Sequence, residues 1–564
     1  MSRKLLLLLA ATTVLAACKP ETQAPVATET PSTPASTHEF SPQIDEGDYK
    51  ELVSRLASDE FEGRAPGSVG EDKTVDYIAA QFQRIGLQPG AADGSWYQPV
   101  PMMETTADES TVLHVTDGDN VRDLAFGTDF VLGTRTGQPE VKVDDSELVF
   151  VGYGVNAPEQ DWNDYAGLDV KGKTVVILVN DPGFHAKDES LFEGRKMTYY
   201  GRWTYKFEEA ARQGAAAALI VHDTEGASYG WDVVKSSWSG PQFDLLAADD
   251  PDPRLPAQGW ITGDVATQLF ADSGLDIQQM YAAANQRGFK AVPLKGKVSF
   301  DLKSSISEKA SRNVIGVLPG TDLSDQAVLY MAHWDHLGKH EGEGDVIFNG
   351  AVDNATGVAG IIEIAGQFAA ADPKPRRSAV FVAVTLEESG LLGSKYYVAH
   401  PTFPLDKIAG VVNIDAMSVA GRSRDLVVTG LGSSQLEDIL KTYADQQGRT
   451  LTSEDNTAAG YYFRSDHFNF AKAGVPALYA DGGRDLVEGG VEAGKAAGAE
   501  YAKCYHQACD EVRDSWKYDG IVQDLEALYG VGATLAGSDQ WPNWYDGNPF
   551  KAARDAMMQA ESAK

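Results

Sequence analysis

The sequence predicts an α/β protein in which a mostly parallel mixed sheet is flanked by helices and interrupted by a β-rich insertion. Three observations support this. Apolar residues recur at helical spacing within residues 44–110, short β-branched runs separated by loops fill residues 111–306, and apolar runs alternate with helical patterns over residues 307–564. Alternation of strand and helix is typical of a sheet whose strands run parallel. A chain of 564 residues is also too long for one compact core.

The first residues carry export signals. Two basic residues at positions 3 and 4 precede a short apolar stretch, which predicts a signal peptide over residues 1–17. The sequence Leu-Ala-Ala-Cys at 15–18 resembles the bacterial lipoprotein cleavage box, which implies that Cys18 carries a lipid; an ordinary secretory signal is the alternative. The Pro, Thr, Ala, Ser and Glu content of residues 18–43 predicts a disordered tether. We therefore expect a cell-envelope protein on the periplasmic face or outer membrane, held only by its anchor.

The segment 44–110 is expected to form the N-terminal part of the main domain. Its apolar residues predict a helix near Leu52 and Leu56 and another over residues 71–85, which Gly86 would terminate. Glycines and a proline make residues 62–68 a loop. Over residues 111–306, strands are predicted at 146–152, 174–179 and 217–221, with a helix at 204–213. This insertion has few clustered His, Asp or Glu residues, so we expect no catalysis from it.

The main part, residues 307–564, alternates regularly. Strands are predicted at 328–332, 379–386, 409–414 and 475–479, and helices at 354–371, 389–400, 434–447 and 519–536. Ligands of such sheets collect at the carboxyl ends of the strands. His333, Glu387, Glu388 and Asp415 all fall at such ends, which predicts one shared site.

The charge and the cysteines restrict the class of protein. Lys and Arg number 48 and Asp and Glu 82, so the net charge of −34 argues against nucleic acid and anionic membrane surfaces as partners. Apart from Cys18, the cysteines are Cys504 and Cys509, which could form a local disulfide in an oxidising compartment. A cysteine-based zinc site and two free thiols are the alternatives.

The residues at the strand ends suit a two-metal site. Imidazole and carboxylate groups are ligands that zinc prefers. Asp353 lies in a turn just before a helix, where a carboxylate could bridge two metals. Glu387 and Glu388 diverge after their strand, so one could bind metal while the other acts as a base. Two zinc ions would lower the pKa of a bound water to about 7. The sequence therefore predicts a metal-dependent hydrolase.

Five motifs in order resemble those of the secreted bacterial zinc aminopeptidases, whose superfamily includes the glutamate carboxypeptidases and transferrin receptors. The motifs are His333-x-Asp335, Val352-Asp353-Asn354-Ala355-x-Gly357, Glu387-Glu388, Asn413-x-Asp415-x-Met417 and Tyr505-His506-x-x-x-Asp510. The resemblance extends over nearly everything after residue 44 and implies the zinc exopeptidase fold. Within residues 140–290 the stretches 149–154, 164–165 and 170–173 are similar to a protease-associated domain, which implies a cover over the mouth of the active site.

The resemblance implies a role for each residue. Asp353 would bridge two zinc ions. One ion would be held by His333 and Asp415, and the other by Glu388 and His506. Among the remaining residues, Glu387 would be the general base, Asp335 would orient His333, and Tyr505 would donate to the oxyanion. The other histidines near these motifs, His336, His340 and His467, are not expected to be ligands.

We therefore expect an aminopeptidase that releases N-terminal residues from peptides. A carboxypeptidase for C-terminal acidic residues is the first alternative, since Arg422, Arg464 and Arg484 could bind an α-carboxylate. A glutaminyl cyclase, which needs one zinc, and a non-catalytic peptide-binding lipoprotein are the others. The sequence predicts no oligomeric state.

Overall fold

The structure, a computed structural model, describes residues 38–562. The predicted signal peptide, Cys18 and most of the predicted tether lie outside the described residues. The last part of that tether, residues 38–43, contacts the folded domain. The backbone N–H of Ser41 donates to Asp48, and the guanidinium of Arg84 lies 3.8 Å from the ring centroid of Phe40. The ring of Phe40 gives residues 38–43 an apolar surface to bury, so these residues pack on the folded domain although the sequence predicts them to be disordered.

The main sheet is mixed, with a parallel centre. Its strands run in the order β1 (Gln88–Pro89), β13 (Val292–Leu318), β17 (Arg377–Val384), β14 (Leu323–His333), β18 (Ile408–Asn413), β21 (Ala477–Gly482), β19 (Asp425–Val428) and β20 (Thr450–Ser453). The strands β17, β14, β18 and β21 are parallel neighbours, whereas β13 and β19 pair antiparallel at either side. This confirms the predicted fold class.

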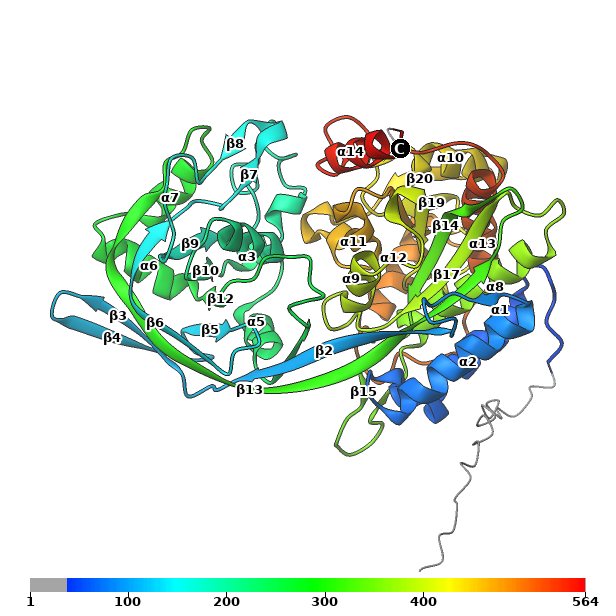
Figure 1. The fold of residues 1–564 in the computed structure, drawn as a ribbon, viewed down its shortest axis with the longest axis horizontal. Helices are drawn as coiled ribbons and strands as arrows, with labels where there is room; N and C mark the ends of the chain where they lie inside the picture. The colour runs from blue at the N-terminus through cyan, green and yellow to red at the C-terminus, as the bar shows by residue number, and fades with distance from the viewer. Residues whose placement is uncertain (1–37, 563–564) are drawn as a thin grey trace, which may run out of the picture. The chain divides into compact units, whose positions relative to one another are not determined.

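Helices cover both faces of this sheet (Figure 1). Alternate residues of β14 point to opposite faces, with Val328 and Tyr330 in one core and Leu329 and Met331 in another. The first core is shared with α1 (Glu46–Leu56), α2 (Val69–Ile85), α8 (Thr356–Ala370), α10 (Leu436–Gln446) and α13 (Asp519–Ala536). The second is shared with α9 (Leu392–Ala399), α11 (His467–Lys472) and α14 (Lys551–Ser562). Burial on both faces explains why these strands read as continuous apolar runs.

The insertion forms a second sheet with its own cores. Its order is β4 (Asn120–Ala125), β3 (Val112–Asp117), β13, β6 (Glu140–Phe150), β9 (Thr174–Leu178), β10 (Ala217–Val221), β12 (Ala257–Ile261) and β5 (Phe130–Gly133). The helices α3 (Trp203–Arg212), α5 (Trp231–Trp238), α6 (Gly263–Asp272) and α7 (Ile277–Ala284) belong to the same part.

One long strand joins the two sheets. β13 pairs with β6 at its start and with β17 at its end, and between these it pairs with β2 (Tyr97–Ala107), which also pairs with β11 (Pro241–Leu245). Figure 1 shows this ribbon running from one part to the other. The sequence did not predict it. Among the described helices, none has the length and apolar character needed to cross a membrane.

Buried ion pairs also hold the insertion against the main domain. Lys395 Nζ lies 2.6 Å from Asp250 and 2.9 Å from Asp252. Lys472 Nζ lies 2.9 Å from both Asp252 and Glu208. The lysines lie on α9 and α11, and the carboxylates belong to the insertion. Each cation therefore has two anionic partners across the junction.

Candidate metal centre

The five residues predicted to bind metal converge at the carboxyl edge of the main sheet. His333 ends β14, Glu388 follows β17, and Asp415 follows β18. Asp353 lies in the turn before α8, and His506 follows α12 (Gly490–Tyr501). Because parallel strands bring their carboxyl ends to the same edge, residues far apart in sequence meet there.

Asp353 lies between two imidazoles. Its Oδ1 is 3.2 Å from His333 Nε2, and its Oδ2 is 3.2 Å from His506 Nε2. His333 Nε2 is also 3.2 Å from Asp415 Oδ1, and His506 Nε2 is 3.1 Å from Glu388 Oε2. The site thus has two groups of three ligands that share one carboxylate. Histidine and carboxylate donors in such groups fit zinc.

His336, which was not expected to be a ligand, also lies at this site. Its Nδ1 is 2.6 Å from Glu388 Oε1, and possible ligand atoms of His336, Asp353 and Glu388 all lie within 4.8 Å of one another. Its Nε2 is buried and has no hydrogen-bond partner among the described residues. His336 therefore holds one oxygen of Glu388 while His506 faces the other. Its position just after Asp335 at a strand end was the signal in the sequence.

The other two histidines lie away from the ligand groups. His467 is buried, with ring centroids 4.6 Å from Tyr462 and 5.3 Å from Tyr479, and burial lowers its pKa to about 3. His340 is exposed and stacks on Phe348 at 4.2 Å. Among the described residues, neither belongs to a candidate metal group.

Glu387, the predicted base, is half-buried just after β17, and its backbone N–H donates to Asp335 Oδ1 at 3.2 Å. Burial raises the pKa of Glu387 well above its usual value; His333 opposes this, and the charge of Glu388 adds to it. A carboxylate with a raised pKa is a stronger proton acceptor. Asp335 contacts His333 through two groups: His333 Nδ1 is 3.1 Å from the Asp335 backbone oxygen and 3.8 Å from its carboxylate.

Two tyrosines lie beside the last ligand. Tyr505 is 50% exposed, and its ring stacks on that of His506 with centroids 3.9 Å apart. Its predicted role as an oxyanion donor stays a prediction. Tyr501, for which the sequence predicts no role, has a buried hydroxyl with no hydrogen-bond partner among the described residues. A disulfide joins Cys504 and Cys509, which lie on either side of Tyr505 and His506.

Residues that do not touch the ligand groups position the loops that carry them. Arg64 is buried and donates to the carbonyl oxygens of Trp334, Asn349 and Gly350. It thus ties the turn after β14 to the turn before Asp353. The glycines and proline of residues 62–68 predict a loop, and nothing in that pattern indicates a buried cation.

Two further side chains orient the carboxylate ligands. Asp510 accepts hydrogen bonds from the backbone N–H groups of Val352 and Asp353 at 3.0 to 3.1 Å. Ser465 Oγ donates to Asp415 Oδ2 at 2.6 Å. Such outer contacts fix the ligands before any ion arrives.

Residues 313–528, which contain all five predicted ligands, match Peptidase family M28. This segment is therefore similar to that peptidase family, and the predicted resemblance is confirmed over it. The assignment of the insertion to a protease-associated domain stays a prediction.

Similar proteins include the leupeptin-inactivating enzyme 1 of Streptomyces exfoliatus, 30% identical over 167 residues. That alignment covers 29% of this chain and 36% of the relative. A vacuolar membrane protease of Candida dubliniensis is 29% identical over 121 residues, or 22% of this chain and 12% of the relative. The chain thus matches about a third or less of these relatives' length.

Among solved structures, an aminopeptidase from Aneurinibacillus sp. strain AM-1 has a TM-score of 0.47 and 20% identity, with 88% of this chain and 94% of that chain covered. A zinc aminopeptidase from Bacillus subtilis has a TM-score of 0.40 and 17% identity, with 90% and 100% covered.

Proposed function

We propose that the protein is a zinc-dependent exopeptidase that removes N-terminal residues from peptides. One observation carries the proposal: Asp353 presents its two carboxylate oxygens to His333 and His506, each at 3.2 Å. The match of the surrounding segment to a peptidase family supports it.

In this proposal His333 and Asp415 would hold one zinc ion, Glu388 and His506 would hold a second, and Asp353 would contribute to both. Bound zinc would polarise the scissile carbonyl and acidify a water. Glu387 would accept the proton of the attacking water and deliver it to the leaving amine. The substrate's N-terminal ammonium needs an anion nearby, and carboxylate oxygens of Glu387 or Asp415 would supply it.

The first prediction concerns the metal. A strong chelator should abolish hydrolysis of aminoacyl amides, and two equivalents of zinc per chain should restore it. Metal content measured beside the rate distinguishes the alternatives. One equivalent of zinc with release of ammonia from an N-terminal glutamine, and no hydrolysis of aminoacyl amides, favours a glutaminyl cyclase; peptide binding with no zinc favours a non-catalytic protein. Full activity after thorough metal removal would contradict the proposal.

A specific observation keeps the carboxypeptidase alternative open. The Nε atoms of Arg202 and Arg464 are buried and have no hydrogen-bond partner among the described residues. Burial and then the like charge of Arg464 lower the pKa of Arg202 to about 10, so the two cations interact. Arg464 also precedes Ser465, which contacts the ligand Asp415. Arg484, by contrast, already pairs with Asp455.

A pair of dipeptides separates the two activities. An aminopeptidase should cleave a dipeptide with a free amine and a blocked carboxyl group, and should leave the N-blocked dipeptide intact. Cleavage of the N-blocked substrate alone would favour the carboxypeptidase.

The envelope location and a lipid on Cys18 belong to the same proposal; loss of membrane association in Cys18→Ser would support them.

A further inference from the structure

A pocket lies between the insertion and the main domain, apart from the metal centre. It is lined by residues 159 and 160 and by segments near residues 192–200, 430–463 and 547–550. None of the proposed metal ligands lines it, and neither does Glu387.

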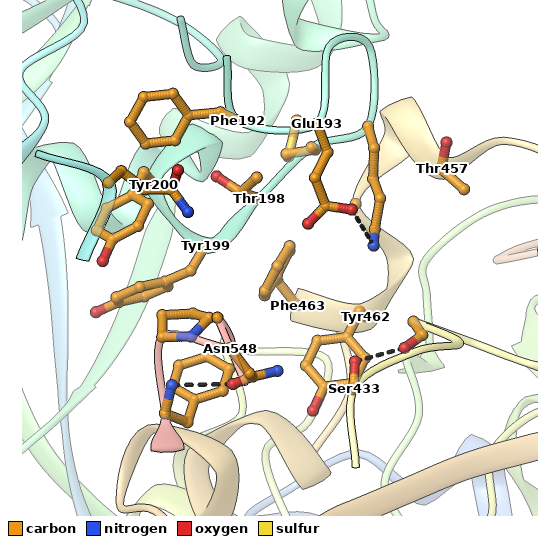
Figure 2. A pocket seen from close by; sticks show the side chains of 18 of the residues that line it. Phe192, Glu193, Thr198, Tyr199, Tyr200, Ser433, Thr457, Tyr462, Phe463 and Asn548 are labelled. Carbon is orange, nitrogen blue, oxygen red and sulfur yellow. Dashed lines mark hydrogen bonds and ion pairs between the residues drawn. The ribbon is translucent and has the colours of Figure 1, made fainter. Parts of the chain in front are cut away.

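Aromatic rings form much of its wall. Figure 2 shows Tyr199, Tyr200, Tyr462 and Phe463 among the side chains around the pocket. These rings hold one another in place: the centroids of Tyr199 and Tyr200 are 5.6 Å apart, and those of Tyr462 and Phe463 are 5.3 Å apart in an edge-to-face pair. The electron-rich face of such a ring attracts cations.

The charged groups in the wall are mainly acidic. The lining contains Glu159, Glu193, Glu454 and a single basic side chain, Lys196. Lys196 Nζ pairs with Glu193 at 2.7 Å (the dashed line beside Glu193 in Figure 2). The two other carboxylates accept hydrogen bonds only from neutral groups among the described residues.

Neither carboxylate pairs with a cation among the described residues; Glu159 is exposed and Glu454 is half-buried. Glu159 accepts from the Tyr200 hydroxyl at 2.5 Å, and Glu454 accepts from the Gly430 N–H at 3.1 Å and from Ser453 Oγ at 2.7 Å. The net charge of the wall is therefore negative, which disfavours an anionic ligand.

One of the lining residues, Tyr462, also has an unused polar atom. The Tyr462 hydroxyl is buried and has no hydrogen-bond partner among the described residues, and the whole residue is only 6% exposed. A buried hydroxyl without a partner is costly, and a ligand group that bonds to it would remove that cost.

We propose that this pocket binds a small organic cation, an alkylammonium or guanidinium group carried on an apolar body. The rings would contact the cation and its apolar body, and Glu159 and Glu454 would supply the opposite charge. The site is separate from the peptidase function proposed above and does not depend on it.

The pocket has a physical route to the metal centre. The ring of Tyr462 lies 4.6 Å from that of His467, which lies 5.3 Å from that of Tyr479. The Tyr479 hydroxyl donates to the backbone oxygen of Asp415 at 3.3 Å. A molecule in the pocket would therefore contact the first of a continuous row of rings that ends at Asp415, a proposed metal ligand.

Calorimetric titration with benzyltrimethylammonium tests the proposal. A quaternary ammonium has no free electron pair, so it cannot bind zinc at the metal centre. The zinc-loaded protein should bind one equivalent, whereas neopentylbenzene, which has the same shape without the charge, should bind about tenfold more weakly or not at all.

Two sets of variants locate the binding. Glu159→Gln with Glu454→Gln should weaken binding about tenfold, whereas Glu225→Gln, an exposed residue outside the pocket, should leave it unchanged. Phe463→Leu, with its fold checked by thermal melting, should weaken it by removing a ring face. Equal binding of the neutral analogue, no binding at about 10 mM, or undiminished binding by the double Gln variant would each overturn the proposal.

Discussion

At the scale of single residues, the two adjacent glutamates have different surroundings. Glu388 faces His336 and His506, whereas no hydrogen bond of the Glu387 side chain occurs among the described residues. Glu387→Gln should therefore retain both zinc ions and lower kcat by roughly 10²–10⁴, the range for loss of a general base. Metal analysis and steady-state kinetics measure both effects. A loss of zinc together with activity would instead make Glu387 a ligand.

His336 allows a second prediction at this scale. Because its Nδ1 holds Glu388 Oε1 at 2.6 Å, His336→Ala should weaken zinc binding by roughly 10- to 100-fold, as removal of outer-sphere partners does elsewhere. Competition with a chromophoric chelator gives the affinity. His340→Ala is the matched control, since that exposed ring stacks on Phe348 away from the ligands. Equal affinities of the two variants would show that His336 does not position Glu388.

The difference between His336 and the predicted ligands shows what the sequence could supply. Strand ends are readable from apolar runs, so His333, Glu388 and Asp415 could be placed at one edge. Side-chain direction beyond a strand end depends on the loop conformation, which here is fixed by contacts of Arg64 with residues about 270 to 290 positions away. No local pattern encodes such contacts.

At the scale of elements, the helices and strands that could be predicted are those whose apolar residues recur at a regular spacing. The helix predicted at 519–536 matches α13, and the strand predicted at 217–221 matches β10, because both bury apolar residues. The middle of β13 pairs with β2 but is largely polar and exposed, so it shows no apolar period. Helix α12 is rich in Gly and Ala and buries only Gly494, and it was not predicted either.

The contact between α1 and α8 leads to a prediction on pH. Glu363, on α8, is 5% exposed and accepts a hydrogen bond from the Asp45 N–H at 3.0 Å; burial raises its pKa to about 8. Between about pH 4.5 and 8 the native chain holds a proton here that the unfolded chain releases. Stability from this group is thus full below the unfolded pKa and is lost as pH rises toward 8.

Glu363→Gln keeps the oxygen acceptor and carries no charge at any pH. Its free energy of unfolding should therefore exceed that of the unsubstituted protein by up to a few kcal/mol at pH 8, and the difference should vanish near pH 4. Urea unfolding at several pH values measures it. The exposed Glu526→Gln, on α13, serves as control. A pH-independent difference would contradict a buried, protonated Glu363.

At the scale of the whole molecule, the ion pairs between the insertion and the main domain decide how firmly the two parts are joined. The side chains of Lys395 and Lys472 are only 8% and 18% exposed. Burial alone would raise the pKa of Asp252, but the charges of the two lysines outweigh it and the pKa is lowered. Removing one partner from a buried pair typically costs about 3–5 kcal/mol, because the other charge is left buried alone.

Lys472→Met should therefore destabilise the protein by a few kcal/mol, whereas Lys441→Met, which removes an exposed pair with Asp445, should cost less than about 1 kcal/mol. Hydrogen exchange should rise in α3, which carries Glu208, and in α11, while α13 stays protected. If the insertion controls access to the metal centre, long peptides should then be cleaved faster relative to short ones. Equal effects of the two substitutions on stability and exchange would mean that apolar packing, such as that of Tyr199 on Phe468 at 5.7 Å, holds the junction without help from the charges.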